Sequence, residues 1–365
     1  MILHFLTKDK FCGYALRQFS EAQMSSDFVL IGDAGDTLED GGRRVPSVAP
    51  GTDEFASLVG SLGKYRAIVL HGLFWPWQED VLRNVPDSVK VAWVFWGGDI
   101  YGRSDVRKDF LSRRSRCLLA LHRTSGLLKG KKETEKYDLP KELLHRIDYC
   151  LTDIPEDLEF FNRYIGKEVK SLWYNYYSIE QTVGPLSGCR CRGSNVLLGN
   201  SATLECNHAD VFRTLRKSKS FDKVVVPLSY GSPWVRNMIS GYGKAVMGAR
   251  FEPLTSFLPL EEYNRILLGC SCVIMPHHRP QAFGNIITSL WLGCRVYMSK
   301  KSILFAFFKR NGFLIHSIED DLREHQDFSP LSEEEMSVNR AILESLYSVE
   351  AMNLKNIEIV RALDA

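Results

Sequence analysis

The sequence lacks any long apolar run. Hydrophobic residues make up 45% of its 365 residues, yet no stretch approaches the ~20 consecutive apolar residues that a membrane-spanning helix requires. The apolar start, Met1–Thr7, leads straight to Lys8 and is too short for a secretory signal, which also needs a preceding basic segment. These absences predict a chain that folds in water, without a membrane span.

Several fingerprints of nucleotide and ester chemistry are also missing. Gly-x-Gly-x-x-Gly does not follow the first predicted strand, which argues against a classical dehydrogenase. Neither a Gly-x-x-x-x-Gly-Lys-Ser/Thr loop nor a Gly-x-Ser-x-Gly elbow occurs, so phosphate-loop nucleotidases and α/β-hydrolases are disfavoured. No Asp-x-Asp motif of the metal-dependent kind stands in a convincing loop.

Nine cysteines are scattered along the chain, and an odd number without a secretory signal favours reduced thiols over a disulfide framework. The two close pairs, Cys189 with Cys191 and Cys270 with Cys272, have one intervening residue each, whereas zinc knuckles usually have two or more. We therefore expect no structural metal site.

The net charge of +2 gives no indication of nucleic-acid binding, but the charges are unevenly distributed. Between Tyr101 and Glu135 there are ten Lys or Arg and four acidic residues, interleaved with leucines. Such a segment fits an anionic membrane surface, and a solvated basic helix face is the other interpretation. The residues expected at the membrane surface are Arg107, Lys108, Arg113, Arg114 and Arg116.

Short apolar runs separated by longer connections predict parallel βαβ units. The expected strands of the first half are Ile2–Leu6, Phe28–Ile31, Ala67–Leu70, Val91–Trp96, Tyr149–Thr152 and Glu168–Tyr177, with a loop over Gly41–Gly51. Those of the second half are Asn195–Leu198, Lys223–Pro227, Lys244–Met247, Cys272–Met275, Arg295–Met298 and Gly312–Ile315. The predicted class is α/β, with two Rossmann-like domains facing a central cleft.

A stretch of low periodicity around Gln181–Ser194, with several Gly and Pro residues, is typical of an interdomain linker. The predicted domains are residues 1–185, residues 195–340, and a C-terminal helix over residues 341–365 that packs back on the first domain.

In the first half, polar residues and glycines follow two predicted strands. His71 and Gly72 follow one strand, and Trp96-Gly97-Gly98-Asp99-Ile100-Tyr101 follows another. The carboxyl ends of strands line the ligand crevice of open α/β sheets, so His71 and Asp99 are expected to project there. Asp99 is the first candidate for a general base and His71 the second, while an N-cap is the structural alternative for Asp99.

In the second half, Gly199-Asn200-Ser201 follows a strand and precedes a helix, an arrangement that suits a phosphate group. A simple turn with a helix cap is the alternative. The loop after strand Cys272–Met275 contains Arg279, which can grip a diphosphate, and Gly284 and Asn285 at a helix start, whose amides can bind the same anion. His277 and His278 of this loop are expected to be solvated, since a metal site would need a third ligand.

Four motifs together resemble one family, the TDP-N-acetylfucosamine:lipid II N-acetylfucosaminyltransferases, or glycosyltransferase family 56. These motifs are His71-Gly72, Trp96-Gly97-Gly98-Asp99-Ile100-Tyr101, Leu198-Gly199-Asn200-Ser201 and Val224-Val225-Val226-Pro227-Leu228-Ser229-Tyr230, and their order and approximate spacing agree over most of the chain.

This resemblance implies a GT-B fold and transfer of an acetamido-deoxyhexose from a TDP-sugar to an undecaprenyl-diphosphate-linked glycan, at the cytoplasmic face of a bacterial inner membrane. The nucleotide sugar is a co-substrate, and no separate cofactor or nucleic-acid partner is implied. Donor-binding residues would be Gly199, Asn200, Ser201, Tyr230, Arg279, Gln281, Gly284 and Asn285. Acceptor-side residues would be Gly72, Trp96, Gly97, Gly98 and Tyr101, beside the catalytic pair Asp99 and His71.

Two alternatives stay open at this point. One is a GT-B transferase that uses another nucleotide sugar, and the other is a module that binds a nucleotide sugar without catalysis.

Overall fold

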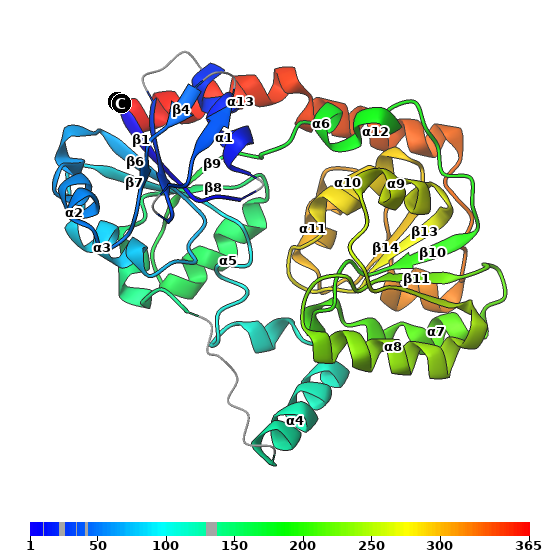
Figure 1. Cartoon of the computed structure of the whole chain (residues 1–365). Coiled ribbons are helices and arrows are strands. Elements are labelled where there is room, and N and C mark those ends of the chain that lie inside the picture. Colours follow the sequence, from blue (N-terminus) through cyan, green and yellow to red (C-terminus); the bar gives the residue numbers. More distant parts are fainter. Residues whose placement is uncertain (10, 22–25, 34, 41–42, 129–136) are drawn as a thin grey trace. The chain divides into compact units, whose positions relative to one another are not determined.

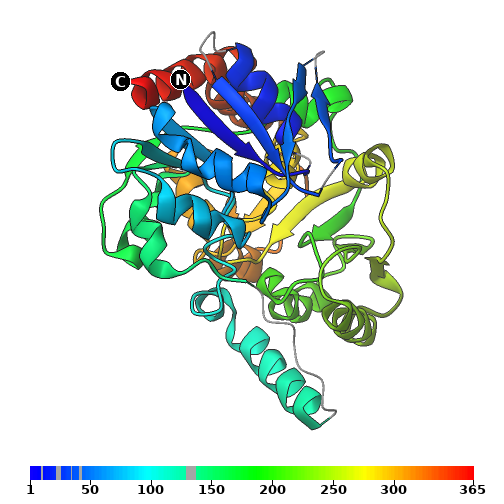
Figure 2. The same ribbon diagram turned by 60° about the vertical axis from the view of Figure 1, so that its left-hand side comes forward.

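The structure is a computed structural model that describes residues 1–9, 11–21, 26–33, 35–40, 43–128 and 137–365. Its contacts divide these residues into two units, each with its own parallel sheet. Unit 1 comprises residues up to 104, residues 137–178 and residues 347–365, whereas unit 2 comprises residues 105–128 and 179–346. Two views show the elements of both units (Figures 1 and 2). The predicted α/β class with two Rossmann-like halves is confirmed.

Unit 1 contains a seven-stranded sheet with the order β5-β2-β1-β6-β7-β8-β9, in which every pairing is parallel. The strands are β1 (Ile2–Leu6), β2 (Ser26–Ile31), β5 (Ser47–Val48), β6 (Ala67–His71), β7 (Lys90–Val94), β8 (Tyr149–Leu151) and β9 (Lys170–Leu172). An antiparallel pair, β3 (Leu38–Asp40) and β4 (Arg43–Val45), stands apart. The helices are α1 (Cys12–Glu21), α2 (Asp53–Gly60), η1 (Leu62–Lys64), α3 (Trp77–Asn84), η3 (Lys141–Arg146), α5 (Pro155–Ile165) and α13 (Val349–Asp364).

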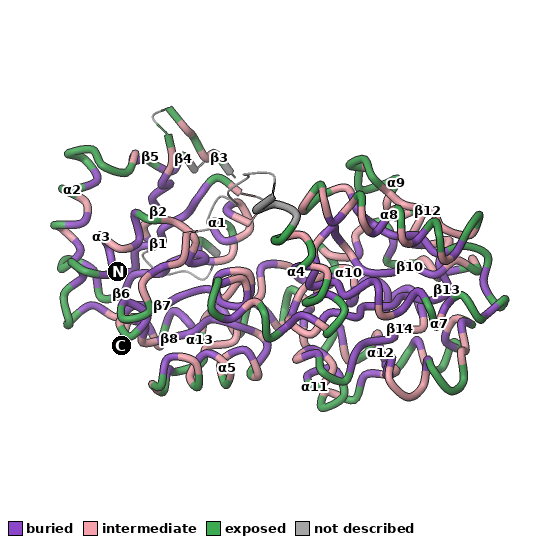
Figure 3. Tube along the Cα trace, turned by 90° about the horizontal axis from the view of Figure 1, so that it is seen from below, coloured by how far each residue is buried: buried purple, intermediate pink, exposed green. Residues whose placement is uncertain are grey.

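Alternation along β1 explains why this sheet is covered on both faces. Ile2 and Leu6 belong to a core cluster shared with α1 and α13, whereas Leu3 and Phe5 belong to a second cluster shared with α2, α3 and α5. Successive side chains of a strand point to opposite faces, so each face has its own core. Buried residues are gathered in the interior strands, whereas exposed residues lie mostly in the outer loops and helices (Figure 3).

Unit 2 contains a six-stranded, all-parallel sheet with the order β12-β11-β10-β13-β14-β15. Its strands are β10 (Asn195–Leu198), β11 (Val224–Pro227), β12 (Phe251–Leu254), β13 (Cys270–Met275), β14 (Arg295–Met298) and β15 (His316–Ser317). In both sheets the first strand in the sequence lies in the interior of the sheet. The next strands are added on one side of it, and the later strands are added on its other side. This reversal creates a switch point, between β1 and β6 in unit 1 and between β10 and β13 in unit 2, where open α/β sheets bind ligands.

The helices of unit 2 are η2 (Arg107–Phe110), α4 (Arg113–Leu128), α6 (Ile179–Val183), η4 (Gly184–Leu186), η5 (Leu204–Cys206), η6 (His208–Asp210), α7 (Phe212–Lys217), α8 (Pro233–Met247), η7 (Gly248–Arg250), α9 (Leu260–Leu268), α10 (Phe283–Trp291), α11 (Ile303–Arg310), the π-helix η8 (Ile318–Leu322) and α12 (Glu333–Tyr347), whose last residue groups with unit 1. Helices α7 and α8 pack on one face of the sheet, and α9 and α10 lie on the other (Figure 1).

Several predicted elements differ from the structure, among them the strand expected over Glu168–Tyr177, of which only β9 is a strand. Lys244–Met247, expected as a strand, is the last turn of α8, because Gly243 does not break the helix but lets Phe251 approach it. The strand expected over Gly312–Ile315 lies later, at β15. The expected loop over Gly41–Gly51 contains both β4 and β5, and its residues 41 and 42 lie outside the described residues.

The sequence analysis also missed β12, which contains Pro253. Proline cannot donate to a sheet ladder, and it fits here because β12 is an edge strand that pairs with β11 alone.

Residues 105–128, expected in the first domain, pack within unit 2. Leu111 and Leu119 join its core, and the Asn207 side-chain oxygen accepts from the Ser112 amide at 3.0 Å and from the Ser115 hydroxyl at 2.8 Å. The sequence pattern of this segment does not show these long-range partners. Lys129–Lys132, the end of the predicted basic segment, lies outside the described residues.

The expected C-terminal helix is two helices. Helix α12 ends at Tyr347, and α13 packs on unit 1 through Ile359, Val360 and Leu363. Within the described part of the chain, no helix combines the length and apolar character needed to cross a bilayer.

Candidate functional site

The turn after β10 lies at the switch point of unit 2 and is built around a glycine. Gly199 has φ +68°, and a Cβ atom there would lie 2.5 Å from His208 Nε2. Both the backbone conformation and the close histidine therefore require glycine at this position.

A hydrogen-bonded network joins the three loops that follow β10, β11 and β13. Gln281 Nε2 donates to Asn200 Oδ1 at 2.7 Å, and Asn200 Nδ2 donates to the Tyr230 hydroxyl at 3.2 Å. Ala202 and Gly231 form an isolated parallel bridge beside it. The structure thus brings Gly199, Asn200, Tyr230 and Gln281 together, as their predicted shared role requires.

Arg279 lies in the same loop as Gln281 and is half-buried. Its Nη1 donates to the Pro280 carbonyl at 3.2 Å, whereas its Nε is buried and has no hydrogen-bond partner among the described residues. A buried guanidinium N–H without a partner costs free energy, so this group is suited to accept an anionic ligand.

Helix α10 begins next to this arginine. Ala282 precedes it with φ +59°, its first turn contains no acidic residue, and a Cβ atom at Gly284 would meet open space. The first amides of a helix have no partners within the helix and carry partial positive charge. Asn285 donates from Nδ2 to the Tyr263 hydroxyl at 3.2 Å, so its side chain ties α10 to α9.

Ser201 has a different place from its neighbours. It is 1% exposed, and its hydroxyl lies 3.2 Å from Thr203 Oγ1 and 3.4 Å from Cys206 Sγ. These contacts place Ser201 inside the turn, where it supports Asn200.

Two histidines are buried beneath these loops. His277 and His208 are 0% and 1% exposed, and neither ring has a hydrogen-bond partner among the described residues. Burial lowers the pKa of His208 to about 3, and burial followed by the charge of Arg279 lowers the pKa of His277, so both rings are neutral. The expectation of a solvated His277 is wrong, and His278 is half-buried. His208 was not predicted as a site residue, because neither the alternation of apolar residues nor the spacing of the motifs distinguishes it from its neighbours.

In unit 1, His71 ends β6 and is buried within a chain of polar contacts. His71 Nε2 lies 3.2 Å from His4 Nδ1, and His71 Nδ1 lies 2.8 Å from the Tyr176 hydroxyl, which also accepts from Trp96 Nε1 at 2.8 Å. Burial lowers the pKa of His71 to about 3. Both ring nitrogens are thus engaged in the protein interior.

Asp99 is 4% exposed and holds its own turn together. One oxygen, Oδ2, accepts from Trp93 Nε1 at 2.9 Å and from the Trp96 amide at 3.4 Å. The structural alternative for Asp99 was an N-cap. Asp99 does accept from a backbone amide, but this amide belongs to Trp96, which precedes it in the sequence.

The predicted acceptor-side residues divide into a surface part and a buried part. Trp96 is half-buried and contacts the half-buried Phe74 and Trp75, with ring centroids 5.6 and 6.2 Å apart. Gly72, with φ +81°, gives room to Phe74 and Trp96. Gly97 has φ +76°, and a Cβ atom at Gly98 would lie 3.5 Å from Phe74. Tyr101 is fully buried and donates to Asp157 Oδ1 at 2.6 Å, which makes it structural.

One carboxylate near this aromatic group was missed. Asp9 follows β1 at the switch point of unit 1 and is half-buried; its Oδ1 accepts from the Phe11 amide at 2.6 Å and the Cys12 amide at 3.1 Å. An acid soon after the first strand was the available signal.

Of the five residues predicted to lie at the membrane surface, four are exposed and one forms an ion pair with a buried acid. Lys108, Arg113, Arg114 and Arg116 are exposed, and Leu121 beside them is 66% exposed. Arg114 Nη1 lies 3.5 Å from Asp210 Oδ1, and Arg116 Nε donates to the Lys108 carbonyl. Arg107 instead forms an ion pair with the buried Glu205.

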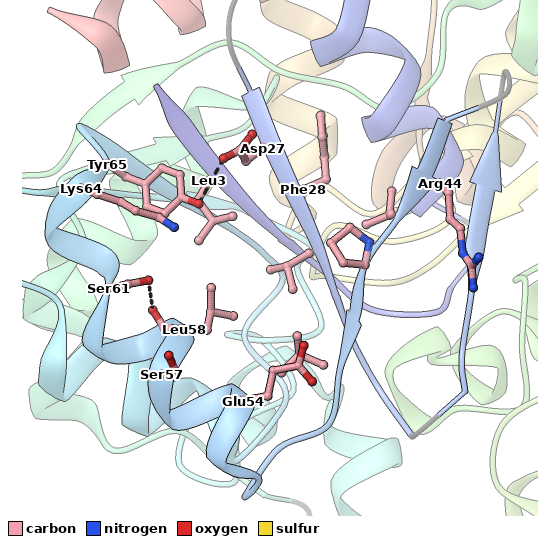
Figure 4. A pocket seen from close by; sticks show the side chains of 14 residues that line it. Leu3, Asp27, Phe28, Arg44, Glu54, Ser57, Leu58, Ser61, Lys64 and Tyr65 are labelled. Atoms are coloured by element: carbon pink, nitrogen blue, oxygen red, sulfur yellow. Dashed lines mark hydrogen bonds between the residues drawn. The ribbon is translucent and has the colours of Figure 1, made fainter.

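A separate cavity of about 500 Å³ lies in unit 1 between α2 and strand β2 (Figure 4). Its lining includes Leu58, Tyr65 and the charged Arg44, Glu54 and Lys64, and the Tyr65 hydroxyl donates to Asp27 at 3.1 Å. None of the predicted site residues lines it. No group of three metal-binding side chains occurs among the residues that the structure describes.

No model of a protein family and no curated protein matches the sequence. Solved structures match over the whole chain. The sucrose-phosphate synthase of Thermosynechococcus elongatus superposes with a TM-score of 0.61 at 12% identity, covering 100% of this chain and 99% of that one. HepE of Anabaena, solved in complex with UDP, superposes with a TM-score of 0.60 at 10% identity, covering 99% and 100%.

The fold is GT-B. A glycosyltransferase from Rickettsia africae superposes with a TM-score of 0.59 at 11% identity, covering 99% of this chain and 98% of that one. At these identities the likeness concerns the GT-B fold itself, and the chemistry has to be argued from the residues of the site.

Proposed function

We propose that the protein is a glycosyltransferase whose unit 2 binds a nucleotide-diphosphate sugar. The observation that carries this proposal is Arg279, with its unpartnered buried Nε, beside the Asn200–Gln281 network and the start of α10. Guanidinium N–H groups and helix-end amides at a switch point match the two phosphates of such a donor. The UDP bound in HepE supports this class of ligand.

The transfer itself needs few groups. The acceptor hydroxyl oxygen attacks the anomeric carbon, the bond from that carbon to the β-phosphate oxygen breaks, and the nucleotide diphosphate leaves. Arg279 and the amides at the start of α10 would stabilise the negative charge that develops on the leaving group. If the reaction inverts the anomeric carbon, a carboxylate or imidazole takes the hydroxyl proton.

For the specific substrates we propose a TDP-linked acetamido-deoxyhexose as donor and a lipid-linked glycan as acceptor. This finer proposal is supported by the motifs shared with the N-acetylfucosaminyltransferases. The aromatic group of Phe74, Trp75 and Trp96 offers flat faces of the kind on which sugars stack. A membrane-bound acceptor also fits the exposed cations Lys108, Arg113, Arg114 and Arg116, which we propose to face an anionic bilayer.

The first test is calorimetric titration of the protein with TDP, UDP and GDP. We expect TDP or UDP to bind and the Arg279→Gln variant to lose about tenfold or more in affinity, the range for a lost charge-assisted contact. Arg213→Gln is the matched control, because Arg213 is an exposed arginine of the same unit. Equal affinity in the wild type and Arg279→Gln would refute the proposed site.

A second candidate function is a nucleotide-sugar-binding module without catalysis. It is favoured by the burial of His71 and Asp99, the two predicted bases. Turnover of a TDP-sugar with a lipid-linked acceptor decides between the two. We expect Asp99→Asn to lower kcat and leave donor affinity unchanged if Asp99 is the base, and Asp9→Asn to do so if the base is Asp9. No turnover in the wild type with TDP-, UDP- or GDP-sugars, with nucleotide binding intact, would favour the binding module.

A further inference from the structure

Arg107 contacts a buried carboxylate next to the proposed donor site. Its Nε donates to Glu205 Oε1, and its Nη2 lies 3.4 Å from Glu205 Oε2, so both carboxylate oxygens face the guanidinium. The Glu205 side chain is 6% exposed and that of Arg107 is 42% exposed. The pair therefore serves to neutralise an acid in the interior, since a carboxylate buried without a partner is costly.

Glu205 belongs to the loop that carries the donor-site network. The next residue, Cys206, contacts Gln281 Nε2 at 3.1 Å and Asn200 Oδ1 at 3.2 Å. Gln281 follows Arg279 by two residues, so these contacts bring the loop of Glu205 and the loop of Arg279 together. Burial raises the pKa of Glu205, but the charge and hydrogen bonds of Arg107, followed by the charge of Arg279, outweigh burial, so the pKa is lowered from its ordinary value.

Arg107 and Arg279 thus both favour the charged form of the buried Glu205 carboxylate. They differ in whether their N–H groups already have hydrogen-bond partners. Arg107 directs two nitrogens at Glu205, whereas Arg279 donates from Nη1 to the Pro280 carbonyl and has a buried Nε without a partner in the described part of the chain. A guanidinium and a carboxylate form a strong forked pair when nothing else occupies the carboxylate.

We propose that Arg107 is a positioning residue of the donor site: by pairing with Glu205 it keeps this carboxylate from capturing Arg279, which stays available for the donor diphosphate. The proposal rests on the proposed function. It gives Arg107 a role in unit 2 that differs from the membrane contact expected from the sequence.

An unpaired Glu205 would also weaken donor binding through its own charge. Without Arg107, the charge of Glu205 would repel a diphosphate and attract the arginine that should bind it. Both effects weaken donor binding, and both vanish when Glu205 becomes neutral. The ion pair therefore predicts a rescue that a purely structural contact would not produce.

The test is TDP and UDP affinity in four proteins: wild type, Arg107→Gln, Glu205→Gln and the double variant. We expect Arg107→Gln to bind about tenfold more weakly, within the usual range of coupling between sites. Glu205→Gln and the double variant should bind like the wild type. Arg213→Gln again serves as the control for loss of an arginine from unit 2.

A double variant that binds as weakly as Arg107→Gln would overturn the proposal, and so would an Arg107→Gln variant that binds as tightly as the wild type. Arg107→Lys adds a second measurement if the neutral variants unfold, because it keeps the charge and should bind closer to the wild type than Arg107→Gln. A wild type that binds neither nucleotide would overturn the proposed function itself, whereas the first two outcomes leave it standing.

Discussion

Gly199 shows how closely a single residue is constrained by its neighbours. Gly199→Ala should lower the free energy of unfolding by about 1–3 kcal/mol, because alanine is strained at φ +68° and its Cβ would collide with His208. Urea denaturation measures the loss. Gly284→Ala is the matched control, since its Cβ meets open space, and it should change the unfolding free energy by less than about 1 kcal/mol. Equal effects at the two glycines would contradict the proposed strain.

Buried His208 links stability to pH. Its folded pKa is lowered to about 3, while an unfolded histidine titrates near 6.5, so the unfolded state binds the proton first as pH falls. The contribution of neutral His208 to the unfolding free energy is complete above pH 6.5 and declines as the pH falls toward 3. We expect this histidine alone to remove roughly 2 kcal/mol between pH 7 and pH 5.

Urea denaturation at several pH values checks this. His208→Gln should make the pH dependence of the unfolding free energy between pH 7 and pH 5 shallower than in the wild type. An unaltered slope in His208→Gln would show that this ring does not carry the effect.

At the scale of elements, η2 and α4 present exposed cations, and α4 also presents the exposed Leu121. Replacing Lys108, Arg113 and Arg116 with Gln should weaken binding to phosphatidylserine vesicles by about a hundredfold, because each cation near an anionic surface contributes about 1 kcal/mol. Cosedimentation at low and high salt measures this. The control replaces Arg213, Arg216 and Lys217 of α7, three exposed cations of the same unit. Equal binding by both triple variants would favour a solvated helix face.

The sequence pattern located most elements because buried parallel strands are short apolar runs. β1, β10 and β13 are of this kind, and their loops contained most of the proposed donor residues. It failed where packing overrides local pattern, as at Gly243 inside α8 and Pro253 in edge strand β12. It could not show that His71 and Asp99 are buried, because burial of a polar side chain depends on partners far away in the chain, such as Tyr176 for His71.

At the scale of the whole molecule, unit 1 depends on the last helix of the chain. Replacing both Ile359 and Leu363 with Ala should destabilise unit 1 by about 4 kcal/mol or more, because each is fully buried and large-to-small changes leave cavities. Leu354→Ala, at a residue of the same helix that is 62% exposed, is the control.

Calorimetric unfolding with and without TDP follows each unit. A ligand stabilises the unit that binds it, so TDP should raise the transition of unit 2, while the double variant should lower the other transition. A variant that lowers both transitions equally would indicate one cooperative unit.

The place of α13 in unit 1 has a consequence for synthesis. The strands of unit 1 leave the ribosome before residues 179–346 of unit 2, whereas Ile359, Val360 and Leu363, which with α1 cover one face of their sheet, leave after them. Unit 2, encoded largely between these parts, can complete its sheet while the part of that face covered by α13 is still exposed. The nascent chain therefore carries an exposed apolar surface while unit 2 is synthesised, and transiently exposed surfaces of this kind are the ones that chaperones protect.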